Sequence, residues 1–325
     1  MSTRPGPTLL QDVRRLLRLR HYSIHTERSY CDWIRRYVRF HKMVSREDLF
    51  PAEPRIESFL SHLAIDQDVA SSTQNQALNA LLFLYKKVLE HETADEINAV
   101  RATKKVNVPV VMSREEVARV IAMMSGTPQI VAKMLYGCGL RISEALRLRV
   151  KDIDPAMKQV TVRSGKGNKD RVTTFPVSLG AVLDQHVSRV QAIHEKDLQQ
   201  GFGAVHLPHA LARKYPNAAC EWGWQYVFPA RSRSRDSRSG ADRRHHLDPS
   251  VINKAIRRAA RSAGLTKTVT AHTFRHSFAT HLLARGTDIR TIQALLGHRN
   301  VATTMIYTHV LQPGGYGVSS PLDDL

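Results

Sequence analysis

Cysteine is scarce in this chain of 325 residues. The three cysteines, Cys31, Cys138 and Cys220, are odd in number, far apart in sequence and without a C-x-x-C spacing. This pattern argues against a disulfide framework and against a cysteine-based zinc site. We expect all three thiols to be reduced and packed inside the protein.

Long apolar runs and a secretion signal are also missing. No apolar segment approaches the length needed to cross a bilayer, and the start MSTRPGPTLLQDVRRLLRLR lacks the apolar core and cleavage site of a secretory signal. We therefore expect a soluble, cytoplasmic protein without membrane association.

Acidic residues are outnumbered by basic ones. The 29 Asp and Glu residues stand against 48 Lys and Arg residues, which gives a formal net charge of +19. Such a charge creates a positive field that attracts polyanions and makes their binding sensitive to salt. Nucleic acid is the leading candidate partner. An anionic membrane surface is the rival explanation, which the lack of a long apolar segment and of a secretion signal disfavours.

The length of the chain exceeds that of a usual single core, so two domains are expected. Residues 1–92 show four short helical patterns with apolar stripes and basic outer faces. We expect their Tyr and Trp residues to pack in the core rather than to stack on bases, and the arginine faces to contact DNA or to be solvated. Residues 93–109 lose the periodicity and predict a linker. A capping box over 113–116 then opens the second domain, residues 110–325.

The second domain combines many helical patterns with few strands, which predicts a mainly α fold with a small antiparallel sheet (α+β). Residues 160–162 and 172–175 alternate like strands around the segment SGKGNKDR and predict a hairpin with Lys166 near its turn. Residues 226–228 indicate another strand. The arginine and serine tract 231–244 predicts a mobile basic loop, either solvated or in specific contact with a partner.

Several candidate functional side chains follow one another near the end of the chain. A helix that begins near Thr270 carries His272 and Arg275 on one face, a second helix ends at Gly297 so that His298 lies at its terminus, and a short third helix presents Tyr307. A lone histidine or tyrosine of this kind is usually structural. The ordered combination H-x-x-R, L-G-H-R and Y-T-H is a much more specific signal.

Other kinds of site are disfavoured by the spacing. His276 and His281 lie four and nine residues after His272, and we expect them not to share its face, which argues against a metal site. The glycines around Lys166 do not form a Walker motif, and those around Cys138 do not form a dinucleotide fingerprint.

The segments LYGCGLRISEALRLRVKDID, GKGNKDR, HTFRHSFATHLL and LLGHRNVATTMIYTHV resemble the tyrosine recombinase family. The segments ALARKYPNA, RRHH and GVSSPLDDL are similar to those of the integron integrases within that family. The resemblance implies a SAM-like, helical core-binding domain over 1–92 and a catalytic domain over 110–325 that together clamp around DNA. It also implies an insert at about 194–246 and a tail at about 311–325 that docks on a neighbouring protomer, with a frayed terminus as the alternative.

The resemblance implies that Tyr307 is a nucleophile that forms a 3′-phosphotyrosyl link and releases a 5′ hydroxyl, without metal or other cofactor. The remaining members of the implied catalytic set are Arg141, Lys166, His272, Arg275 and His298. Two guanidinium groups can clamp the phosphate, and the lysine can protonate the leaving oxygen. His272 can assist proton removal from Tyr307, and His298 can donate a hydrogen bond to the phosphate. Glu144 either orients Arg141 or is an ordinary helix N-terminal carboxylate.

By the same resemblance the chain would insert or excise gene cassettes as a homotetramer, on duplex sites and on sites folded from one DNA strand. Trp224, His245 and His246 would hold unpaired bases of the folded sites, although Trp224 could instead pack under the insert. The alternatives are a Xer-like recombinase on duplex sites and a noncatalytic DNA-binding regulator.

Overall fold

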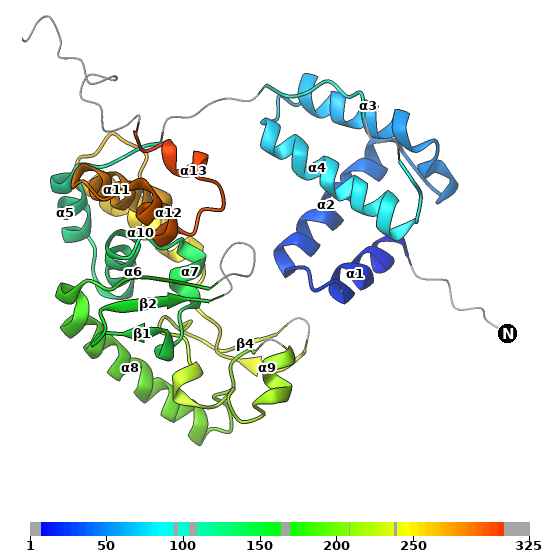
Figure 1. Cartoon of the computed structure of the whole chain (residues 1–325). Helices are drawn as coiled ribbons and strands as arrows, with labels where there is room; N and C mark the ends of the chain where they lie inside the picture. Colours follow the sequence, from blue (N-terminus) through cyan, green and yellow to red (C-terminus); the bar gives the residue numbers. More distant parts are fainter. Residues whose placement is uncertain are drawn as a thin grey trace, which may run out of the picture. The chain divides into compact units, whose positions relative to one another are not determined.

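The computed structural model describes residues 8–93, 97–103, 109–163, 170–207, 209–236 and 239–308. The chain divides into two compact units, Met1–Asn107 and Val108–Leu325. Figure 1 shows helices alone in the first unit, and helices with small sheets in the second. The expected α+β class is confirmed.

The first unit is a helical bundle whose apolar stripes point inward. Val13, Leu17, Ile34, Leu60 and Leu81 have no more than traces of exposed surface. Its elements are α1 (Leu9–Leu19), α2 (Ile24–Phe40), η1 (Glu47–Leu49), α3 (Ala52–Ile65), α4 (Ser71–Phe83) and the π-helical turn η2 (Leu84–Val88). The predicted bundle is therefore present, although its last helix changes from α to π geometry at Leu84.

The aromatic residues of the first unit lie mainly in its core. Trp33, Tyr37 and Tyr85 are buried, and the hydroxyl of Tyr37 lies 2.7 Å from that of Tyr85, which donates to the carbonyl of Leu49 at 2.6 Å. These rings support the bundle, as expected, and their faces are not open to stack on a base.

Part of the expected linker is attached to the first unit. Gln74 on α4 donates to the carbonyl of Val100 at 2.6 Å and accepts from the backbone N–H of Ala102 at 3.0 Å. The side chain of Ile97 is buried in the same core. Residues 97–103 therefore extend the bundle rather than hang free, and the basic pair Lys104 and Lys105 lies outside the described residues.

The first helix of the second unit begins at the predicted capping box. The hydroxyl oxygen of Ser113 accepts from the N–H of Glu116, and the N–H of Ser113 donates to the carboxylate of Glu116 at 2.8 Å. Its helices are α5 (Arg114–Ala122), α6 (Gly126–Gly137), α7 (Ile142–Arg147), η3 (Val150–Asp152), η4 (Val177–Leu179), α8 (Gly180–Gln199), α9 (His209–Lys214), η5 (Trp222–Trp224), α10 (Pro249–Ser262), α11 (Ala271–Ala284), α12 (Ile289–Leu296) and α13 (Ala302–Met305). In Figure 1, α5, α6, α10, α11 and α12 gather into one helical layer, and α8 runs along the sheet.

Two small antiparallel sheets complete this unit. In the first, β1 (Ile153–Asp154), β2 (Gln159–Val162) and β3 (Arg171–Thr174) pair in chain order, with Val160 opposite Thr173. The predicted hairpin strands are thus paired, while the turn with Lys166 lies outside the described residues. In the second sheet, β4 (Ser234–Arg235) pairs with β5 (Asp242–Arg243).

Three expectations about the second unit were wrong. Residues 226–228 form no strand: Tyr226 makes a single bridge with Arg149, and Pro229, directly after this segment, makes one with His246. The tract 231–244 is not an open loop throughout, because residues 234–235 pair with residues 242–243 in the β4–β5 hairpin. Cys220 is exposed, whereas Cys31 and Cys138 are buried free thiols as expected.

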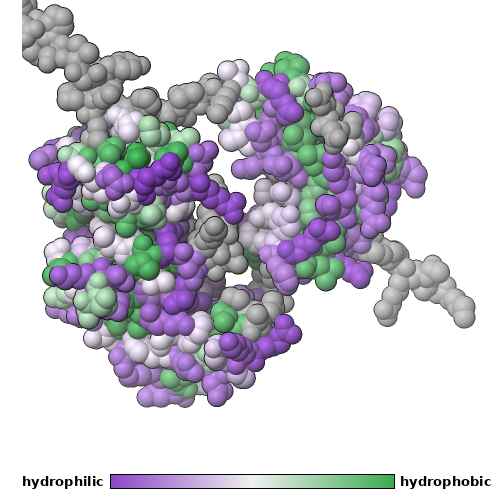
Figure 2. Space-filling view, viewed as in Figure 1, coloured by the Kyte–Doolittle hydropathy of each residue, from purple (hydrophilic) through white to green (hydrophobic). Residues whose placement is uncertain are grey.

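The surface agrees with the polar composition. Figure 2 shows hydrophilic residues over most of the visible face of each unit, with apolar residues in scattered patches. Among the described residues, no helix is long and apolar enough to span a membrane.

Candidate functional site

Two left-handed glycines bring the candidate residues of the second unit together. Gly139 has φ of +63°, and a Cβ there would lie 2.4 Å from the ring of Phe278 on α11. Gly297 has φ of +64°, and its Cβ would lie 2.8 Å from the side chain of Arg171. Only glycine combines this backbone conformation with such close packing. The turns place Arg141 at the start of α7 and His298 just after α12, where its ring contacts Arg275 of α11.

Arg275 lies at the centre of the site and is only 2% exposed. Its Nη1 donates to the carbonyl of Gly139 and its Nη2 to the carbonyl of Leu296, each at 2.6 Å. Burial, followed by the nearby charge of Arg141, lowers its pKa to about 9, while Glu144 acts in the opposite direction. The guanidinium is therefore still charged at neutral pH and is held in one orientation.

Glu144 is the anion that joins the arginines of the site. Its carboxylate accepts from the backbone N–H of Arg141 at 2.8 Å and from Nη1 of the same residue at 2.7 Å, and it lies 3.6 Å from Nη1 of Arg275. Burial would raise its pKa, but hydrogen bonds and charges from Arg171 and Arg141 outweigh burial and lower it to about 2. Both contacts considered from the sequence, to the helix terminus and to the guanidinium, are present.

Arg171 is a member of this cluster that the sequence analysis did not single out. Its two Nη atoms contact both carboxylate oxygens of Glu144, at 2.9 and 2.7 Å, and its Nε donates to the carbonyl of Leu295 at 2.9 Å. It therefore ties β3 to α7 and to the end of α12. Its position at the end of GKGNKDR, directly before the strand predicted over 172–175, was the available signal.

His298 contacts two members of the site through different ring nitrogens. Its Nε2 lies 3.2 Å from Nη2 of Arg275, and its Nδ1 lies 3.0 Å from Oγ1 of the buried Thr304. Because a guanidinium can only donate, Nε2 must accept, so the neutral ring carries its proton on Nδ1 and donates it to Thr304. Burial and the neighbouring arginines lower the pKa of His298 to about 4.

Tyr307 follows α13 rather than lying on it, and it is only 1% exposed. Its ring packs against Phe278, Ile292 and Leu296, and it stacks on His298 with 6.4 Å between ring centroids. Burial raises the pKa of the phenol, and the charges of Arg275 and Arg141 act to lower it. The hydroxyl is thus within the electrostatic influence of both guanidinium groups.

The histidine in contact with this hydroxyl is His276. Its Nδ1 lies 3.0 Å from Oη of Tyr307. His272 is exposed, and its ring stacks on that of His276 with 5.7 Å between centroids. The expectation that His272 and His276 do not share a face was wrong, because residues four apart in an α-helix differ by only about 40° around its axis.

The candidate base-binding residues lie in a cluster of rings and cations. Nζ of Lys151 lies 2.7 Å from the ring centroid of the half-buried Trp224, and therefore covers one of its faces. The rings of His245 and His246 lie 5.5 and 5.3 Å from that of Tyr226. Burial lowers the pKa of both histidines, that of His246 to about 4, so both rings are neutral at neutral pH.

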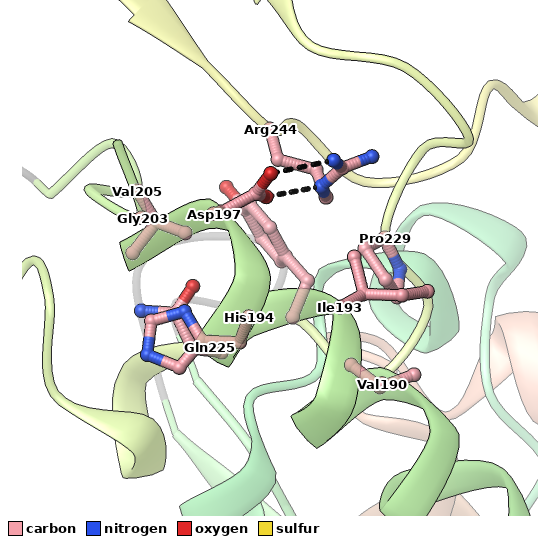
Figure 3. A pocket seen from close by; sticks show the side chains of 10 residues that line it. Val190, Ile193, His194, Asp197, Gly203, Val205, Gln225, Pro229 and Arg244 are labelled. Carbon is pink, nitrogen blue, oxygen red and sulfur yellow. Dashed lines mark hydrogen bonds and ion pairs between the residues drawn. The ribbon is translucent and has the colours of Figure 1, made fainter. Parts of the chain in front are cut away.

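A buried ion pair holds this region against α8. Figure 3 shows Asp197 facing Arg244 beside a small pocket, and Nε and Nη2 of Arg244 donate to the two carboxylate oxygens at 2.6 and 2.8 Å. Arg233 contacts the same carboxylate at 3.5 Å. These arginines of the predicted basic loop are therefore engaged within the protein.

Two of the sequence expectations concern other parts of the chain, and a third concerns metal binding. Lys166 and residues 311–325 lie outside the described residues. Within the part of the chain that the structure describes, no group of three or more His, Cys, Asp or Glu side chains is arranged to hold a metal ion.

Comparison with known proteins identifies the family. The phage integrase family matches residues 110–313, and the phage integrase N-terminal SAM-like domain matches residues 9–95. An integrase/recombinase from Escherichia coli and one from Pseudomonas aeruginosa are each 46% identical over 331 aligned positions, which cover 100% of this chain and 97% of the relative. Tyrosine recombinase XerA from Thermococcus kodakarensis is 29% identical, covering 93% and 90% of the two chains.

Solved structures show the same fold at low identity. The XerH recombinase bound to its difH substrate matches with a TM-score of 0.60 and 18% identity, covering 95% of this chain and 84% of that one. A lambda integrase dimer bound to a core site matches with a TM-score of 0.60 and 14% identity, covering 96% and 97%. With the family matched over both units, the chain belongs to the phage integrase family, the tyrosine recombinases.

Proposed function

We propose that this recombinase cuts and rejoins DNA strands by attack of Tyr307 on a phosphodiester, in the manner of an integron integrase. The observation that carries the proposal is the convergence of Tyr307, Arg275, Arg141 and His298 on one site in a chain of this family. A phosphate under attack gains negative charge, and fixed cationic donors stabilise that charge more in the transition state than in the ground state.

The chemistry follows from the side chains. Oη of Tyr307 forms a bond to phosphorus while the bond from phosphorus to the 5′ oxygen breaks, which leaves a 3′-phosphotyrosyl link and a free 5′ hydroxyl. Arg141 and Arg275 bind the nonbridging oxygens, and Lys166 protonates the leaving oxygen. The 5′ hydroxyl of another strand then attacks the phosphotyrosine, so neither a metal nor a nucleotide cofactor is required for rejoining.

Binding of the phosphate changes the protonation state of His298. In the DNA-free protein its Nε2 accepts from Arg275. To donate a hydrogen bond to phosphate from Nε2, the ring must take up a proton while Nδ1 remains bonded to Thr304. The negative phosphate favours this uptake because it offsets the arginine charges that lower the pKa of His298.

The test is capture of the covalent intermediate. The protein is incubated with a nicked suicide substrate whose 5′ product diffuses away, and the mixture is separated on a denaturing gel. We expect a DNA adduct with the wild-type chain and none with Tyr307→Phe, which should still bind DNA. An adduct formed by Tyr307→Phe would place the nucleophile elsewhere, and none with either protein would favour a noncatalytic DNA-binding regulator.

We also propose that the cluster around Trp224, His245 and His246 holds unpaired bases of folded single-strand sites in cassette insertion or excision. Neutral, partly accessible rings beside cations suit stacking on a base. A base can use the face of Trp224 that Lys151 does not cover, or displace the ammonium.

The alternative is a Xer-like recombinase on duplex sites, which the likeness to XerA favours. Folded single-strand and duplex sites offered side by side separate the two functions. We expect Trp224→Ala to reduce recombination of the folded site more than cleavage of the duplex site, with Trp222→Ala from the same turn as control. Equal losses on both sites would assign Trp224 to packing and favour the Xer-like function.

Assembly and location complete the proposal. We infer a homotetramer on two paired sites, with residues 311–325 docking on a neighbouring protomer, in the cytoplasm. Crosslinking of the chain on paired sites, with and without these residues, tests the assembly.

A further inference from the structure

The α11 helix carries a residue that the proposed chemistry has not used. His276 lies between His272 and the hydroxyl of Tyr307, and it is half-buried, whereas His272 is exposed. The distance of 3.0 Å from its Nδ1 to Oη of Tyr307 is within hydrogen-bond range. His276 therefore contacts the oxygen that would attack phosphorus, a position first expected for His272.

We propose that His276 is a further catalytic residue, which accepts the proton of the Tyr307 hydroxyl through Nδ1 as the oxygen attacks the phosphate. The inference rests on the proposed nucleophilic role of Tyr307. As the bond from Oη to phosphorus forms, the phenolic proton moves to Nδ1, and the imidazole becomes an imidazolium. The leaving 5′ oxygen takes its own proton from Lys166. Rejoining reverses both transfers, and the proton returns from Nδ1 to Oη.

The surroundings of His276 keep its ring neutral, so that Nδ1 can accept a proton. Burial, followed by the neighbouring His272 and the charge of Arg275, lowers its pKa to about 4. The ring is therefore neutral at neutral pH, while burial keeps the phenol of Tyr307 protonated. The pair rests as a neutral hydrogen bond, in which the oxygen is oriented but not ionised.

Binding of the phosphate shifts the balance between neutral and protonated His276 toward the protonated form. The groups that face His276 are His272 and Arg275 on its own helix, Tyr307 after α13, and His298 after α12. A phosphate bound to Arg275 and His298 adds negative charge next to the imidazole, which stabilises its protonated form. His276 consequently becomes more basic at the step in which the phenol must lose its proton. His272, stacked on the outer face of His276, is placed to support the ring rather than to take the proton.

The same helix provides a matched control. Nδ1 of His281 lies 2.8 Å from Oη of Tyr136, which forms a second His–Tyr pair on α11 outside the arginine cluster. Both histidines are partly buried. A purely structural contribution of such a pair should therefore be similar at the two positions.

The experiment compares His276→Asn, His276→Ala and His281→Asn in the suicide-substrate assay between pH 6 and 9. Asparagine can retain a hydrogen bond to Tyr307 but cannot take its proton. We expect both His276 variants to form the adduct at least roughly 100-fold more slowly than wild type at pH 7. Their rates should rise about tenfold per pH unit, because the phenol must ionise before attack. The rate of adduct formation by His281→Asn should remain within about threefold of the wild-type rate. Like the wild-type rate, it should change little between pH 6 and 9.

A second substrate locates the defect. Replacement of the 5′ bridging oxygen by sulfur gives a leaving group that needs no proton, so this substrate should restore Lys166→Ala but not the His276 variants. Folding is checked by the binding of uncleaved DNA. Wild-type adduct rates in His276→Asn, or rescue of that variant by the sulfur substrate, would overturn the proposal. An adduct formed by Tyr307→Phe would instead refute the proposed function itself.

Discussion

Neutralisation of Glu144 should be the most damaging single loss of charge in the second unit. The substitution Glu144→Gln keeps the size of the side chain but leaves Arg141, Arg171 and Arg275 without the carboxylate that they share. The side chain of Glu144 is only 9% exposed, so water can replace little of the lost interaction.

The magnitude follows from the pKa of Glu144, which falls from 4.5 to about 2 in the folded protein. At 1.36 kcal/mol per pKa unit, the ionised carboxylate stabilises the fold by about 3 kcal/mol at pH 7. Because the folded pKa is lowered, this contribution is complete above pH 4.5 and disappears as the pH falls toward 2. Removal of one partner from a buried ionic cluster costs a similar amount, about 3 to 5 kcal/mol.

Urea unfolding of the full-length protein measures the effect, in a Trp33→Phe background so that the fluorescence comes from Trp222 and Trp224 in the second unit. We expect Glu144→Gln to lower the free energy of unfolding by about 3 kcal/mol at pH 7 and to lose this deficit near pH 2. Adduct formation should slow by roughly 10- to 100-fold, because the clamp loses its geometry.

The control is Glu116→Gln, at the capping box that opens α5. Glu116 contacts one lysine, Lys267, at 2.7 Å, and its side chain is 18% exposed. Its replacement should cost about 1 kcal/mol. A deficit for Glu144→Gln no larger than that of the control, together with a wild-type rate of adduct formation, would refute the idea that one carboxylate organises the arginines.

The remaining predictions concern metals, pH and the arginine fork. Adduct formation should proceed in EDTA at the rate measured without it, whereas a strict requirement for magnesium would contradict the proposed mechanism. The second unit should lose stability as the pH falls from 6.5 to 4. The reason is that His246, His276 and His298 have lowered pKa values in the folded state and gain protons on unfolding. Midpoints of urea unfolding that stay constant over this range would contradict the prediction. Arg171→Lys keeps the charge but not the bidentate contact, so adduct formation should slow by about tenfold. Arg163→Lys, at a half-exposed arginine that pairs with Asp152, should have no effect on the rate, and equal rates for the two variants would argue against the fork.

Much of the fold could be predicted from the sequence because local signals agreed with the tertiary structure. The apolar stripes of α1 and α2, the capping box at Ser113 and the stop at Gly297 each depend on neighbours within a few residues. Such features are encoded locally and survive packing.

The errors arose where distant contacts decide the structure. Residues 226–228 have strand-like composition, but the partners available in the fold form only single bridges with Arg149 and His246. The composition of the tract 231–244 is typical of solvated, charged surface. Arg244 nevertheless pairs with Asp197 on α8, a residue 47 positions earlier in the chain. No pattern within the tract reveals that partner.

The residues of the site that lie in family motifs could be predicted from the sequence, whereas a residue whose role depends on a distant contact could not. The resemblance selected Arg141, Arg275, His298 and Tyr307, and the structure brings their elements together. It could not reveal that Arg171 would complete the carboxylate cluster, since that contact spans 27 residues and depends on the register of β3.

The most direct test of the central claim is to identify the atom that carries the DNA. The covalent adduct is trapped on a suicide substrate in EDTA, digested with nuclease and protease, and analysed by mass spectrometry. We predict a nucleotide linked through its 3′ phosphate to the peptide that contains Tyr307, at the phenolic oxygen. A nucleotide attached to any other side chain, or linked through its 5′ phosphate, would contradict the account.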